Sequence, residues 1–372
     1  MAAGHIRAML WLGLARLQRG IDGVFGGIAL VVGLSILASL PVLQIVSLGY
    51  LLVAGARVAR GDRLRDCVPG LALLGRLGAI ALGLWLLLWI PRLLASLARD
   101  ASLIDPDGAT GSTLHGLSIG VALLLGLHAL AAAARGGRLR YMLLPRPRHE
   151  FAVLAALCSR DGYCRARDAV WAAWVSLELG TIIRSGVLGF VAAVVWLLVP
   201  TTLLALGSRA PIFAVLGTVT MAMVVFYLPF LQLRVAHEQR LAALMDLETV
   251  RRAHAGAPLA TAMALMLTVS FTLPLYLLKI ELIPAEATWL PGVLFVALML
   301  PARLVCGWAL RRGLARSGPR PRGWRVLGRL LVVPVVVAYA VILYFTQYLS
   351  WYGTWSLYEQ HAFLPPVPFL TP

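Results

Sequence analysis

The chain has 372 residues, of which 60% are hydrophobic and 13% are charged, and its mean hydropathy is +0.85. A soluble domain carries about 45–50% apolar and about 25% charged residues, and a single soluble core cannot bury an apolar excess of this size. The composition therefore excludes a soluble enzyme, a disordered chain and a secreted disulfide scaffold. It predicts an integral membrane protein with several transmembrane helices.

The charged residues are mostly arginine. The 33 basic residues outnumber the 16 acidic ones, which gives a net charge of +17, and Lys279 is the only lysine. They lie in the gaps between apolar runs, as in membrane proteins whose cytoplasmic loops collect Lys and Arg. We therefore expect the bilayer, with anionic lipid headgroups at the basic face, as the partner, and not nucleic acid. The sequence does not identify a protein partner.

Eight apolar segments approach or exceed the about 20 residues that a helix needs to cross the hydrocarbon core. They are residues 24–56, 71–98, 117–134, 186–206, 212–233, 259–280, 290–310 and 327–349. The pattern predicts an all-α fold, a polytopic bundle of transmembrane helices. We expect it to form a single integral membrane domain over residues 1–372.

The first apolar segment, residues 24–56, is longer than one span and has Pro41 at its middle. One interpretation is a single kinked and tilted helix. The other is a re-entrant hairpin that turns near Pro41, with the turn buried in protein. Arginines flank both ends of the segment, so both ends favour the cytoplasmic side. This charge pattern favours the hairpin.

The loops then alternate in charge along the chain. Inside segments at 1–23, 57–70, 135–185, 234–258 and 311–326, with their span ends, hold 28 of the 33 basic residues. The outside segments and their span ends hold four, and Arg303 lies inside a span. The asymmetry predicts a cytoplasmic basic segment at 135–185 and a C-terminus outside.

Three segments outside the spans have an interfacial character. Residues 6–17 resemble an amphipathic helix lying in the membrane surface. Trp171, Trp174 and Leu177 share one face of a second such helix, or belong to the aromatic belt at the start of the next span. The tail at 350–372 is rich in Trp and Tyr, so we expect an external aromatic tail on the outer surface.

Catalytic signatures are absent from the sequence: it has no phosphate-binding loop, no nucleophile elbow and no metal-ligand spacing. We therefore expect neither a cofactor nor a metal, and the sequence leans against an enzyme. Two polar residues at membrane depth are candidate functional positions, His128 and Arg303. The alternatives are a core hydrogen bond for His128 and snorkelling to the inner interface for Arg303. Lys279 and Glu281 predict an interfacial ion pair.

The first apolar segment supplies the other candidate positions. Gln44 follows Pro41, Gly49 permits close helix approach, and Tyr50 can place its hydroxyl on a neighbouring backbone. The sequence at 40–44, LPVLQ, has an echo at 228–232, LPFLQ. The echo indicates either an internal duplication or chance in a chain rich in Leu and Pro.

The same region carries a family resemblance, which covers roughly residues 24–80. A Pro-ended apolar run is followed by a Gly-Tyr pair and then by a basic stretch with a Gly and an Asp. The residues are Pro41, Val42, Leu43, Gln44, Leu48, Gly49, Tyr50, Leu51, Leu52, Arg57, Arg60, Gly61 and Asp66. This pattern resembles the domain-of-unknown-function 4013 group of bacterial multi-pass membrane proteins. The resemblance implies the bacterial inner membrane and no established activity.

Three functions remain open. The first is a non-enzymatic protein that supports or organises other envelope components. The second is a transporter or permease-like protein with a site near kinked helices, and the third binds or modifies lipids. A water-filled cavity lined by Arg303, His128 or Gln44 would favour transport, and a lateral groove with clustered acids or histidines would favour lipid chemistry. A solidly packed bundle would favour the support role.

Overall fold

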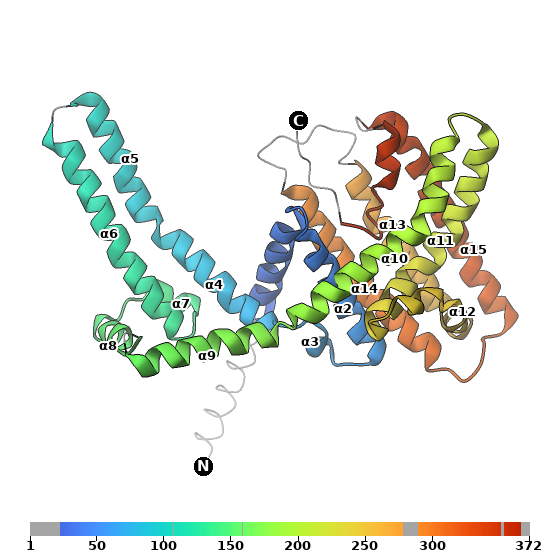
Figure 1. Ribbon diagram of the computed structural model, residues 1–372, viewed down its shortest axis with the longest axis horizontal. Helices are drawn as coiled ribbons and strands as arrows, with labels where there is room; N and C mark the ends of the chain where they lie inside the picture. Colours follow the sequence, from blue (N-terminus) through green and yellow to red (C-terminus); the bar gives the residue numbers. More distant parts are fainter. Residues whose placement is uncertain (1–22, 107, 158, 278–288, 351–352, 366–372) are drawn as a thin grey trace, which may run out of the picture. The chain divides into compact units, whose positions relative to one another are not determined.

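A computed structural model describes residues 23–106, 108–157, 159–277, 289–350 and 353–365. These residues form helices joined by turns, and the described ranges contain no β-strand. The chain divides into two compact units (Figure 1). Unit 1 comprises Met1–Leu30 and Gly70–Leu177, and unit 2 comprises Val31–Pro69 and Glu178–Pro372.

Seven helical stretches in the described part of the chain are long and apolar enough to cross a membrane. They are Leu71–Ile104, Ala109–Ala134, Arg160–Leu206, Pro211–Glu238, Pro258–Tyr276, Leu290–Leu314 and Arg322–Leu349, with a shorter apolar helix at Gly23–Ala38. The predicted segments fall in helical stretches, apart from the first, residues 24–56, which a turn at 39–43 interrupts, and the sixth, residues 259–280, whose end lies outside the described residues. The prediction of an all-α polytopic helix bundle is confirmed.

The first apolar segment forms two helices. Helix Gly23–Ala38 ends before Pro41, and α2 (Gln44–Arg60) follows it. Between them Val42 has a φ of +68°, and its carbonyl oxygen accepts from the N–H of Ile45 at 3.2 Å. Ser47 of α2 donates a hydrogen bond to the carbonyl oxygen of Leu34 at 2.7 Å, so the two helices touch beyond the turn. The chain therefore breaks at Pro41 and is not one kinked helix. The hairpin prediction places the turn inside the protein, and here the structure differs, because Pro41, Val42 and Leu43 are exposed.

Unit 1 contains α4 (Leu71–Leu87), α5 (Trp89–Ile104) and α6 (Ala109–Ala134). The predicted span at 71–98 is thus two helices with a break at Leu88. Helices α5 and α6 lie side by side, and Gly111 of α6 approaches the backbone of Ala98 in α5 (Figure 1). Three further helices complete the unit: α7 (Leu139–Leu143), α8 (Pro147–Leu157) and α9 (Arg160–Ser176).

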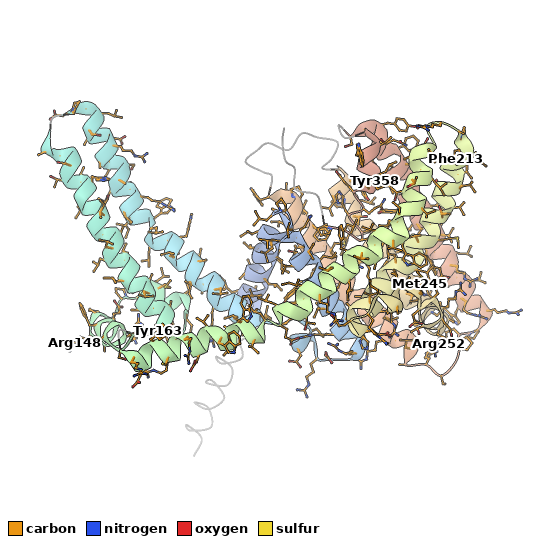
Figure 2. The ribbon with its side chains drawn as sticks, in the orientation of Figure 1. Arg148, Tyr163, Phe213, Met245, Arg252 and Tyr358 are labelled. Carbon is orange, nitrogen blue, oxygen red and sulfur yellow. The ribbon has the colours of Figure 1, made fainter. Side chains whose placement is uncertain are left out.

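Unit 2 is the larger bundle. After α2 and the short α3 (Leu64–Cys67) it contains α10 (Leu179–Leu206), α11 (Pro211–Glu238), the 3₁₀ helix η1 (Leu241–Met245), α12 (Leu247–Gly256), α13 (Pro258–Leu277), α14 (Leu290–Leu314), α15 (Arg322–Leu349) and the 3₁₀ helix η3 (Gly353–Tyr358). Figure 2 shows Tyr358 and Phe213 at one end of this unit and Met245 and Arg252 at the opposite end. A large apolar core joins α2, α10, α11, α13, α14 and α15.

Helix α2 packs against α10 on one side and α14 on the other. Glycines make both contacts: a Cβ atom on Gly49 would overlap the carbonyl oxygen of Ile182 in α10, and one on Gly307 of α14 would overlap that of Gly55 in α2. Lipid tails are as apolar as the helix surfaces, so membrane helices associate through close backbone approach at small residues. The glycines therefore place α2 in the centre of unit 2.

Some predicted features fall outside the described residues. These are the amphipathic helix at 6–17 and the ion pair of Lys279 with Glu281. Trp171 and Trp174 do lie on a helix, α9, and both side chains are exposed.

Candidate functional site

The most buried charged side chain in the described part of unit 2 is Arg303 of α14, which is 2% exposed. Its Nη2 donates to Oε1 of Gln232 in α11 at 2.8 Å and to the carbonyl oxygen of Ala362 at 3.0 Å. Its Nε and Nη1 are buried and have no hydrogen-bond partner among the described residues. A guanidinium in a protein stays protonated. The site is therefore a buried positive charge whose Nε and Nη1 donors lack acceptors among the described residues.

Gln232 connects three parts of unit 2. Its Nε2 donates to the carbonyl oxygen of Gly189 in α10 at 3.0 Å and to that of Phe363 at 3.2 Å. Its Oε1 accepts from Arg303. The amide therefore uses both of its ends, and it holds α10, α14 and the chain end together around α11.

The C-terminal segment, residues 353–365, enters the bundle. Leu357, Ala362 and Phe363 belong to its apolar core, and Gln360 and His361 are also buried. The sequence predicts a tail lying on the outer membrane surface, and the described part of the tail differs. Among the described residues of this segment, Trp355 is an example of a side chain that remains exposed. The composition of the tail suits an interface, but its backbone carbonyls find donors inside the bundle.

Two tyrosines hold the C-terminal segment from the other side. The hydroxyl of Tyr339 in α15 donates to Oε1 of Gln360 at 2.8 Å. The hydroxyls of Tyr276 in α13 and Tyr339 lie 3.1 Å apart, and Tyr276 also donates to the carbonyl oxygen of Glu359 at 3.3 Å. The segment from Glu359 to Phe363 is thus hydrogen-bonded to four helices: α11, α13, α14 and α15.

The candidate positions of the first apolar segment surround the turn and α2. Pro41 is exposed in the turn, and the buried Oε1 of Gln44 has no partner among the residues that the structure describes. Gly49 lies against the backbone of α10. The hydroxyl of Tyr50 donates to the carbonyl oxygen of Pro69 at 2.8 Å, a backbone contact of the kind that the sequence suggests. These contacts hold α2 in place.

His128 lies in unit 1, and Arg303 and Gln44 lie in unit 2. The Nε2 atom of His128 is 2.7 Å from the carbonyl oxygen of Met142. A carbonyl oxygen can only accept a hydrogen bond, so Nε2 carries a proton. Its Nδ1 is 3.0 Å from Oε1 of Glu150, and Arg135 reaches the same oxygen at 3.3 Å. These contacts of His128 and Arg135 with Met142 and Glu150 join α7 and α8 to the end of α6. We call this group of four residues the clasp.

Several charges bear on Glu150, which lies in α8 outside the apolar spans. Burial raises its pKa, but the hydrogen bonds that it accepts and the charge of Arg135 lower it more. The pKa of this carboxyl therefore lies below its ordinary value. The clasp contains an ionised carboxylate at neutral pH.

Sequence reasoning missed the partners of Arg303. In the sequence, Gln232 stood out only as the last residue of the LPFLQ echo. The equivalent residue in the first copy, Gln44, lies in a different local structure. Pro41 precedes a helix in a turn, whereas Pro229 lies inside α11. The two copies therefore differ in local structure. Tyr276, Tyr339 and Gln360 carried no spacing that would relate them before folding.

The arrangement around Arg303 can hold an anion or stabilise the C-terminal segment. Comparison of the chain with protein-family models, with curated proteins and with solved structures finds no match.

Proposed function

We propose that this multi-pass membrane protein is a non-enzymatic component that organises or supports other proteins of the bacterial inner membrane. The observation that carries the proposal is the apolar surface of unit 1. In the most apolar stretch of α4 and α5 only 11% of the residues are buried, and in that of α6 28%, whereas the values in unit 2 run from 28% in α11 to 50% in α13 and in α14.

Large apolar side chains are exposed along α4 and α5 and along α6 of unit 1. They include Leu77, Trp85, Trp89, Leu93, Leu97, Leu117, Leu123, Leu124, Leu127 and Leu130. A transport path through this unit would need polar walls, because an unpaired polar or charged substrate is costly to dehydrate. Apolar helices with this much free surface face lipid or the helices of other membrane proteins. Contact with the helices of other membrane proteins would give the protein an organising role.

Unit 2 supports the same proposal over transport. Arg303 and Gln232 are buried in contacts, and α2 meets its neighbours at the backbone. His128 belongs to the other unit.

The proposal extends to the setting of the protein. The pattern from Pro41 to Asp66 supports membership of the domain-of-unknown-function 4013 group and with it the bacterial inner membrane. Exposed arginines on the short helices of unit 1 support anionic headgroups as partners. Figure 2 shows one of them, Arg148, on α8.

Site-specific photo-crosslinking in intact cells tests the organising role. A photo-reactive residue replaces Leu93 of α5 or Leu123 of α6, which are 60% and 66% exposed, or Ala131 of α6, which is 0% exposed and serves as the control. We expect a discrete protein adduct from the two outward positions and none from position 131. Adducts to lipid alone at both outward positions would overturn the proposal.

A further inference from the structure

We propose that Arg303 and Gln232 form a binding site for a single oxyanionic group, a phosphate or a carboxylate, and that the segment from Glu359 to Phe363 occupies this site when no anion is bound. The inference is independent of the organising role of unit 1. It starts from the donors of Arg303 that have no partner.

Arg303 has five N–H groups. The two on Nη2 have neutral acceptors, Oε1 of Gln232 and the carbonyl oxygen of Ala362. The one on Nε and the two on Nη1 have none in the described ranges, although both atoms are buried. A buried polar group without a partner destabilises the fold, and more so when it is charged. Three such donors on one side chain indicate a missing acceptor.

The charge balance points to an anion as that acceptor. None of the ion pairs between described residues includes Arg303. The nearest polar partners are an amide and a backbone carbonyl, which leave the charge uncompensated. A buried charge is stable when it is paired and hydrogen-bonded. An oxyanion supplies both the charge and the acceptors.

The shape of the guanidinium specifies how the anion binds. A carboxylate or phosphate takes two parallel N–H groups along one edge of the guanidinium. Nη2 contributes to both of the edges at which such a pair can form, with Nε or with Nη1. Both N–H groups of Nη2 are already used, so a bidentate anion must replace either Gln232 Oε1 or Ala362 O. Ala362 is the candidate for exchange, because its carbonyl lies in a turn outside the helices, whereas Gln232 lies within α11.

The C-terminal segment is attached in a way that permits this exchange. Its carbonyl oxygens at Ala362 and Phe363 accept from Arg303 and Gln232, in place of a ligand. When Ala362 withdraws, Gln232 remains held by Gly189 of α10 and keeps its oxygen on Arg303. The cradle of α10, α11 and α14 therefore persists without the segment.

The ligand chemistry is shared by two sources. One is the phosphate of a lipid headgroup, and the other is inorganic phosphate. The test separates them by offering each alone.

The experiment uses the full chain purified into nanodiscs and measures its thermal unfolding. Wild type is compared with Arg303→Lys, Arg303→Gln and the control Arg252→Gln, whose side chain on α12 is exposed. One arm adds inorganic phosphate to nanodiscs of a galactolipid, a bilayer lipid that contains no phosphate. The other replaces part of the galactolipid with phosphatidylglycerol and adds no phosphate.

We expect an anion to raise the unfolding temperature of wild type and of R252Q equally. Arg303→Lys keeps the charge but loses the planar fork, so the apparent affinity should fall about tenfold, the equivalent of one charge-assisted hydrogen bond. Arg303→Gln should show no response. A response in the phosphatidylglycerol arm alone assigns the site to a lipid headgroup, and one in the phosphate arm alone assigns it to a soluble anion.

Two results would overturn the proposal. Wild type that responds to neither arm would show that Arg303 serves only the packing of the chain end. Equal responses of wild type and R303K in both arms would place anion binding elsewhere on the basic surface. R303K retains a charge in the core, so it keeps the test decisive if R303Q fails to fold.

Discussion

Oε1 of Gln232 accepts a hydrogen bond from Nη2 of Arg303 at 2.8 Å, and this bond joins α11 to α14 in the interior of unit 2. The same amide donates to the backbones of Gly189 and Phe363. One glutamine therefore fixes a buried arginine, a neighbouring helix and the chain end. The hydrogen bonds of Gln232 favour a single arrangement of these elements, because a shift of its amide would leave a buried group unpaired.

The glycine contact between α2 and α14 predicts an unusual effect of alanine. Gly307→Ala places a methyl group against the carbonyl oxygen of Gly55, so we expect a loss of about 1–3 kcal/mol from overpacking. Gly180→Ala in α10 is the matched control, because a Cβ there meets nothing within 4 Å. It should be neutral or stabilising by up to about 1 kcal/mol. Thermal unfolding in nanodiscs measures both, and equal effects would contradict close packing at Gly307.

The clasp of unit 1 predicts a pH-dependent opening. The pKa of Glu150 lies below its ordinary value of 4.5, so its ionised form stabilises the folded clasp. This contribution is complete above pH 4.5 and is lost as the pH falls through the lower folded pKa. The protection factors of the backbone amides in α7 and α8, which correct for the intrinsic pH dependence of hydrogen exchange, should therefore fall in acid below that value and stay high near pH 7.

Glu150→Gln provides the mutational form of this test. We expect it to loosen α7 and α8 at pH 7 by about 1.5–3 kcal/mol, the range for a hydrogen bond to a charged group. The control is Asp168→Asn, an exposed acid in the same unit that pairs only with its neighbour Arg167. Unchanged exchange in E150Q would show that the clasp does not depend on the carboxylate.

The tyrosines of α13 and α15 predict how firmly the C-terminal segment is held. Tyr339→Phe removes the donor to Gln360 and leaves a buried amide oxygen unpaired, so we expect a loss of about 1–3 kcal/mol. Tyr348→Phe in the same helix is the control, because Tyr348 is exposed. Limited proteolysis reads the result: Y339F should be cleaved in the C-terminal segment faster than Y348F. Equal cleavage rates would contradict the contact.

The spans could be predicted from the sequence because their cause is local. An apolar run of about 20 residues must become a helix in the bilayer, since its backbone groups have no other partners there. The break at Pro41 was visible for a similar reason, because proline lacks an N–H and both flanks are basic. Gly49 also showed its role, as only a small residue permits such an approach.

The interior of the polar site could not be predicted. Arg303 stands alone in its span, and its partners come from α11 and from the chain end, far away in the sequence. The tail has the aromatic composition of an interfacial segment, and only the fold shows that Leu357 and Phe363 are buried. Pairings between distant helices depend on which faces meet, and one sequence does not state this.

The topology of the chain is the central claim, and cysteine labelling tests it most directly. In a cysteine-free background, single cysteines replace Asp62 after α2, Ser208 between α10 and α11, and Ser317 between α14 and α15. A membrane-impermeant thiol reagent should label position 208 in intact cells, and positions 62 and 317 only after permeabilisation. Labelling of positions 62 and 208 from the same side of intact cells would contradict the alternation of spans between them.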